Sequence, residues 1–126
     1  MKSMKVAVSL LILFLISPAM ANGWESPEKK SGGVKAILKI DPEKSMVDLY
    51  LNDAVSNRPI TGALVKAAIK TPDGGEIEKE LIGMRMGEAF SYMNTLEMSK
   101  KGKYSFEIKV DSGGTKVPFS FFYDAK

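Results

Sequence analysis

The sequence predicts an all-β protein built as a two-sheet antiparallel sandwich. Short segments in which apolar and polar residues alternate recur along the chain, as expected for strands with one buried face. Gly, Pro, Asn and Asp residues separate these segments, and no stretch between them carries the apolar stripe of a helix. Seven such segments within about a hundred residues are typical of two packed antiparallel sheets.

The expected strands are closed by recognisable turns. Pro72-Asp73-Gly74-Gly75 is the strongest turn signal, because Pro sets φ at the first turn position and Gly accepts a positive φ. Pro118 lacks the N–H group that an interior strand needs, so the last strand is expected at a sheet edge. In chain order the strands are expected over residues 34–40, 46–51, 63–70, 76–82, 89–96 and 103–110, with a seventh after the Ser112-Gly113-Gly114 turn.

The first 33 residues are expected to lie outside this domain. Lys2 and Lys5 precede an apolar run over residues 6–16, and the small residues Ala19 and Ala21 follow, as in a cleaved signal peptide. The run is shorter than the roughly 20 residues that a membrane-spanning helix needs. We therefore expect a signal peptide over residues 1–21, a flexible arm over 22–33 and the domain over 34–126. The mature chain would be periplasmic, with no membrane span.

Composition excludes several function classes. The chain contains no His and no Cys, so it lacks the base of a serine triad, a thiolate nucleophile and the usual ligands of zinc or Cu(II). The formal net charge of +3 falls to +1 once Lys2 and Lys5 leave with the signal peptide. A nearly neutral domain lacks the basic surface of a nucleic-acid-binding protein. We expect a non-enzymatic monomer that does not bind nucleic acid.

A group of methionines is the main candidate for a binding site. Thioether sulfur is a soft, uncharged ligand that suits Cu(I) or Ag(I). Met84 and Met86 are two residues apart between Gly83 and Gly87, a spacing that suggests a loop or bulge with both side chains on one side. Met93 on the following strand could approach them, so we predict Met84, Met86 and Met93 as ligands. The alternative is that flexible methionines fill the core or form a partner interface.

The segment Gly102-Lys103-Tyr104-Ser105-Phe106 resembles the start of strand F in immunoglobulin-like domains, where a tyrosine hydroxyl bonds back to the preceding corner. Together with Arg58-Pro59-Ile60-Thr61-Gly62-Ala63 and Pro72-Asp73-Gly74, it makes residues 34–124 resemble the exported YtkA-like and FixH-like immunoglobulin-type domains of bacteria. The resemblance implies a seven-stranded, antiparallel immunoglobulin-like β-sandwich. It also implies a link with metal handling and efflux systems.

Three functions stay open on the sequence alone. The first is a binding or accessory module of the bacterial cell envelope, with an envelope protein as partner and a transport or metal-efflux system nearby. The second is a periplasmic protein that binds Cu(I) or Ag(I) through its methionines, and the third is a structural spacer domain. An exposed apolar patch would favour a partner-binding module over a spacer.

Overall fold

The computed structural model describes residues 28–126, which form one antiparallel sheet of eight strands. In space the strands follow the order β1-β2-β3-β6-β5-β4-β7-β8. No helix within residues 28–126 is long and apolar enough to cross a membrane. The strands are β1 (Glu28–Ser31), β2 (Val34–Asp41), β3 (Met46–Asp53), β4 (Leu64–Lys70), β5 (Glu76–Met86), β6 (Ala89–Thr95), β7 (Gly102–Ser112) and β8 (Thr115–Ala125).

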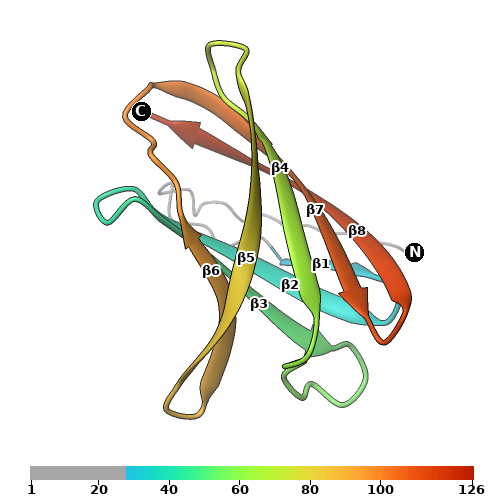
Figure 1. Ribbon diagram of the computed structural model, residues 1–126. Helices are drawn as coiled ribbons and strands as arrows, with labels where there is room; N and C mark the ends of the chain where they lie inside the picture. Colours follow the sequence, from blue (N-terminus) through green and yellow to red (C-terminus); the bar gives the residue numbers. More distant parts are fainter. Residues whose placement is uncertain (1–27) are drawn as a thin grey trace, which may run out of the picture.

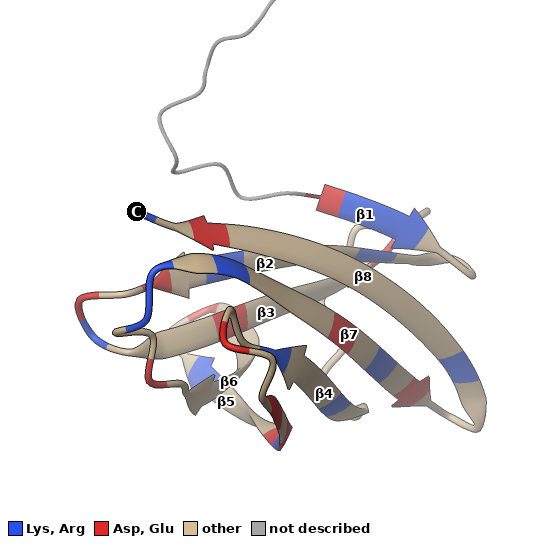
Figure 2. Ribbon diagram, turned by 90° about the horizontal axis from the view of Figure 1, so that it is seen from above, with Lys and Arg blue, Asp and Glu red and all other residues tan. Residues whose placement is uncertain are grey.

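The sheet curls until its two edge strands approach each other, which gives a nearly closed, barrel-like shape (Figure 1). Seen from above, β1 lies beside β8 (Figure 2). The ammonium group of Lys29 in β1 sits 5.9 Å from the ring centre of Phe121 in β8. Strand β5 links the two halves of the sheet, because residues 76–81 pair with β4 and residues 82–86 pair with β6.

The predicted all-β antiparallel class is confirmed, whereas the seven-stranded immunoglobulin-like sandwich is wrong. An eighth strand, β1, lies within the expected arm and pairs with β2 from Glu28 opposite Ile37 to Ser31 opposite Val34. Strand β5 also continues to Met86, past the predicted end at Ile82, and so joins the two halves into one sheet. The expected signal peptide and the remainder of the arm, residues 22–27, lie outside the described residues and stay predictions.

The core fills the inside of the curled sheet. Alternate side chains of β7, predicted to share one buried face, are buried as expected: Tyr104, Phe106, Ile108 and Val110 are at most 1% exposed. Strand β8 adds Phe119 and Phe121 to the same core. Because β8 ends the strand order, the edge position predicted from Pro118 is confirmed.

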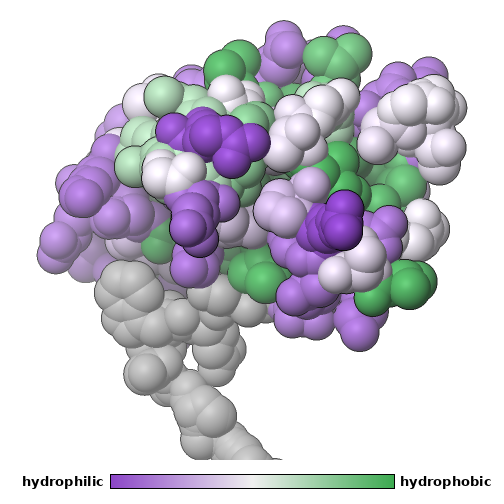
Figure 3. Space-filling model, turned by 90° about the horizontal axis from the view of Figure 1, so that it is seen from below, coloured by the Kyte–Doolittle hydropathy of each residue, from purple (hydrophilic) through white to green (hydrophobic). Residues whose placement is uncertain are grey.

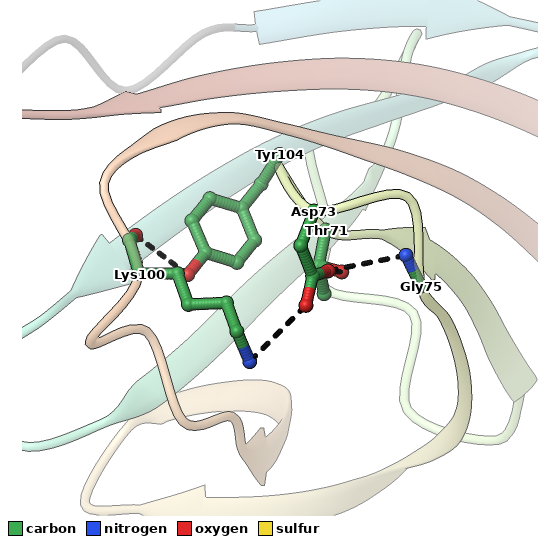
Figure 4. Close-up of polar contacts among 5 residues, drawn as sticks. All are labelled: Thr71, Asp73, Gly75, Lys100 and Tyr104. Carbon is green, nitrogen blue, oxygen red and sulfur yellow. Dashed lines mark hydrogen bonds and ion pairs between the residues drawn. The ribbon is translucent and has the colours of Figure 1, made fainter.

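The predicted turn between β4 and β5 is organised by Asp73 (Figure 4). Its Oδ1 accepts hydrogen bonds from the Thr71 hydroxyl and from the Gly75 N–H, the latter at 3.1 Å. The bond from Thr71, followed by the bond from Gly75, lowers the pKa of Asp73 to about 2. The ammonium group of Lys100 lies 3.4 Å from Oδ2. The turn is therefore tied to the loop that precedes β7.

Tyr104 donates its hydroxyl hydrogen to the carbonyl oxygen of Lys100 at 2.8 Å, which is the predicted corner bond (Figure 4). We expect Tyr104→Phe to lower the free energy of unfolding by about 1–3 kcal/mol, because a partly buried carbonyl loses its partner. Urea denaturation measures the difference. The control is Tyr123→Phe, since the Tyr123 hydroxyl forms no hydrogen bond within residues 28–126. Equal midpoints for the two variants would contradict a stabilising role for the corner bond.

Candidate metal centre

Met84 and Met86 lie on the outer face of β5, close to the turn into β6. Their exposed fractions are 48% and 63%, and Ile82 on the same face is 52% exposed. The expected loop or bulge at this position is wrong, because β5 stays a regular strand as far as Met86. The turn comprises Gly87 and Glu88, and φ of +65° at Gly87 fits the first position of a type II′ turn. Strand alternation therefore directs both thioethers outward.

The opposite side of β5 is covered by aromatic rings from β6. A Cβ atom on Gly83 would lie 2.8 Å from Cζ of Phe90 and 3.3 Å from Cε2 of Tyr92, so only glycine leaves room for this packing. Arg85 points to the same side, with its guanidinium carbon 5.4 Å from the centre of the Phe90 ring. The positive charge of Arg85 is therefore held on the face away from the methionines.

Met93 shares the outer face with Met84 and Met86. The register of β5 and β6 places Met93 opposite Ile82 and Met84 opposite Ser91, so Met93 is a diagonal neighbour of Met84. Diagonal positions in an antiparallel pair are about 7–8 Å apart, which long side chains can bridge. Met86 is opposite Ala89, four residues from Met93 on β6. Four residues along a strand and one spacing between strands put the positions of Met86 and Met93 about 14 Å apart.

The structure thus places Met84 beside each of the other two predicted ligands but does not place Met86 beside Met93. The predicted set of Met84, Met86 and Met93 on one ion stays a prediction. Met98, by contrast, is 7% exposed and belongs to the core. Met98 therefore serves core packing. Met84 and Met86 are exposed, so they can act as metal ligands or as part of a partner interface.

Strand β3 brings further polar groups to this face. Asp48 lies opposite Met93 on β6 and opposite Lys39 on β2. The ammonium group of Lys39 sits 4.9 Å from the ring centre of Tyr50. Burial raises the pKa of Tyr50 and the nearby Asp48 carboxylate raises it further, while a hydrogen bond with the Ser91 side chain lowers it. These residues could not be predicted from the sequence, because the pairing of β3 with β6 has no local signal in the chain.

The donor set on this face suits a soft cation. Across residues 28–126, no three His, Cys, Asp or Glu side chains gather in a way that could hold a metal ion. Thioethers are therefore the candidate ligands, and they prefer Cu(I) or Ag(I) to harder divalent ions. Viewed from below, the surface of the molecule is mixed, with hydrophobic residues in separate patches between hydrophilic ones (Figure 3).

No family model matches the chain, and no curated protein is similar to it in sequence. The resemblance to YtkA-like and FixH-like domains therefore stays a prediction. Solved structures are similar in fold. A DUF4426 family protein from Pseudomonas aeruginosa has a TM-score of 0.64 at 18% identity, over 78% of this chain and 94% of that protein.

Two further solved structures are similar to this chain. FetP from uropathogenic E. coli, expressed in the E. coli periplasm, has a TM-score of 0.60 at 13% identity, over 80% of this chain and 92% of FetP. A copper-bound variant of Campylobacter jejuni P19 has a TM-score of 0.61 at 12% identity, over 80% of this chain and 97% of P19. At these identities the similarity shows a shared all-β fold and nothing further.

Proposed function

We propose that this chain is an exported, non-enzymatic accessory module of the bacterial cell envelope that binds Cu(I) or Ag(I). The ion is held by two methionines of the β5–β6 hairpin, with Met84 as one ligand and one of its two neighbours, Met86 or Met93, as the other. The observation that carries this proposal is the outward, solvent-accessible placement of Met84 and Met86 on a regular strand, with Met93 on the same face. Thioethers need no deprotonation and select soft cations.

The comparisons support a metal-related role only through the fold. The P19 variant with a similar fold is copper-bound. The resemblance of residues 34–124 to YtkA-like and FixH-like domains, which are linked with metal handling, points the same way. Because this chain has no His, its ligands must differ from any histidine-based site. The absence of His and Cys also supports a non-enzymatic role.

The affinity should be modest. Two neutral sulfur ligands, without a thiolate or an imidazole, hold Cu(I) less tightly than mixed sites that contain those groups. A modest affinity suits a protein that passes a metal ion to another protein. We propose that an envelope protein, as part of a transport or efflux system, donates or receives the ion at this face.

Competition titration of the mature chain with Ag(I), and with Cu(I) under anaerobic conditions, tests the proposal. We expect wild-type protein to bind the ion and the Met84→Leu/Met86→Leu double variant to bind it at least about tenfold more weakly, which corresponds to about 1.4 kcal/mol. Met98→Leu serves as the control, because that thioether is buried in the core. Equal binding by the double variant, or no binding by the wild type, would mean that these methionines serve packing or contact only.

A second candidate function is docking of an envelope protein on the same face. The adjacent exposed residues Ile82, Met84 and Met86 favour it over a spacer role, because neighbouring apolar side chains on a surface commonly mark an interface. The two functions respond differently to substitution. Met→Leu preserves the apolar area and removes the sulfur, so it should weaken metal binding and leave docking intact.

A further inference from the structure

We infer that the Asp48 carboxylate provides the negative charge of the methionine site, beside Met93, and compensates the charge of the bound monovalent cation. This inference rests on the proposed function and adds a residue of a different chemical class to it. It also specifies where on the outer face the ion would bind. The ion would lie over Met93, between Asp48 on one side and Met84 on the other.

The first observation is an unsatisfied polar atom. Oδ1 of Asp48 is buried and has no hydrogen-bond partner among residues 28–126. Burying a carboxylate oxygen without a partner is strongly unfavourable, and such atoms in folded proteins call for a specific explanation. Asp48 is the third of the eight residues of β3 and is paired on both sides, so the direction of its side chain is set by the sheet.

The second observation is that neither flanking strand supplies the missing partner. On β2, Lys39 is directly opposite Asp48, yet its ammonium group lies over the Tyr50 ring and forms no ion pair with Asp48 within the described residues. On β6, the residue opposite Asp48 is Met93. A thioether donates no hydrogen bond. A cation between the carboxylate and the thioether would satisfy both groups.

The positive charge of the bound ion also requires a nearby anion. Thioethers are neutral, so a monovalent ion held by methionines alone would bring an uncompensated positive charge to a partly buried face that already carries Lys39. The Asp48 carboxylate cancels that charge. The distance from Asp48 to each methionine also decides which of them can bind the same ion as the Asp48 carboxylate. Met86 lies two strand spacings and four residues away, about 16 Å, which is too far for a common ion.

The test compares wild-type protein with Asp48→Asn, which keeps the shape of the side chain and removes its charge. Competition titration with Ag(I) should show binding weakened at least about tenfold, which corresponds to about 1.4 kcal/mol. In the metal-free protein the thermal midpoint should stay the same or rise, because a neutral amide replaces a carboxylate whose Oδ1 is buried without a hydrogen-bond partner. Glu78→Gln is the matched control, since it removes one exposed carboxylate from the outer face of β5, away from the methionines.

The outcomes separate the two proposals. If wild-type protein binds Ag(I) and Asp48→Asn binds it equally well, this inference fails while the proposed function stands. If the wild type binds no Ag(I), both fail. If Asp48→Asn lowers the midpoint of the metal-free protein and Lys39→Met lowers it equally, the carboxylate is an ion-pair partner of Lys39 and the inference is overturned.

Discussion

Replacing Phe106 by Ala should lower the free energy of unfolding by about 3–5 kcal/mol, the usual range for deleting a buried aromatic side chain. Phe106 is 1% exposed at the centre of the sheet half formed by β5, β4, β7 and β8. It lies opposite Ile69 on β4 and opposite Phe121 on β8, so its loss leaves a cavity between three strands. Neighbouring strands cannot move together to fill that space without breaking their ladders.

Urea denaturation followed by far-ultraviolet circular dichroism measures this effect. Lys109→Ala on the same strand is the control, because its side chain is exposed and its removal should change stability by less than about 0.5 kcal/mol. A loss as large as 5 kcal/mol approaches the total stability of many domains, so Phe106→Leu serves as a milder variant. A change below about 1 kcal/mol for Phe106→Ala would contradict the placement of this ring in the core.

Replacing Gly102 by Ala should lower the free energy of unfolding by about 3 kcal/mol, from backbone strain and a steric clash together. Its φ is +122°, a conformation that residues with a Cβ atom rarely adopt. An added Cβ would also lie 2.8 Å from Cβ of Pro72, in the turn between β4 and β5. The ring of Pro72 cannot rotate away, so the loop before β7 must shift and weaken its contact with that turn.

The matched control for this prediction is Gly62→Ala. Gly62 has no positive φ, and an added Cβ would meet no atom within 4 Å. We expect no loss of stability there, or a small gain from reduced freedom of the unfolded chain. Thermal denaturation of the two variants gives the comparison. Similar midpoints for Gly102→Ala and Gly62→Ala would contradict the close approach of the two loops.

Most strands could be predicted from the sequence because their alternation is strong and their turns are explicit. Strand β7 and the turn around Asp73 are examples, and both depend on neighbours in the chain. Strand β1 could not be predicted, because Glu28–Ser31 contains no apolar residue and becomes a strand only through pairing with β2. The closure of the sheet was not predicted either, because Gly83 suggested that β5 ends there. In the structure Gly83 lies within β5, since the Phe90 ring packs against the Gly83 backbone and leaves no room for a Cβ atom.

The candidate site was predictable only as far as local geometry reaches. Residue spacing alone places Met84 and Met86 on one face of a strand. The position of Met93 depends on the two-residue turn at Gly87 and Glu88, which fixes the register of β5 and β6. Asp48 joins the same face through the pairing of β3 with β6, which are far apart in the chain. A contact between distant segments leaves no pattern in a single sequence, so the position of Asp48 beside Met93 could be seen only in the structure.

Binding of a soft monovalent cation by thioethers of the β5–β6 hairpin can be observed residue by residue. Nuclear magnetic resonance of the protein, with ¹³C-labelled methionine methyl groups, observes each thioether separately as Ag(I) is added. We expect the methyl signals of Met84 and Met93 to shift, while the signal of the buried Met98 stays in place. Unchanged signals for both Met84 and Met93 at a molar excess of Ag(I) would contradict the claim.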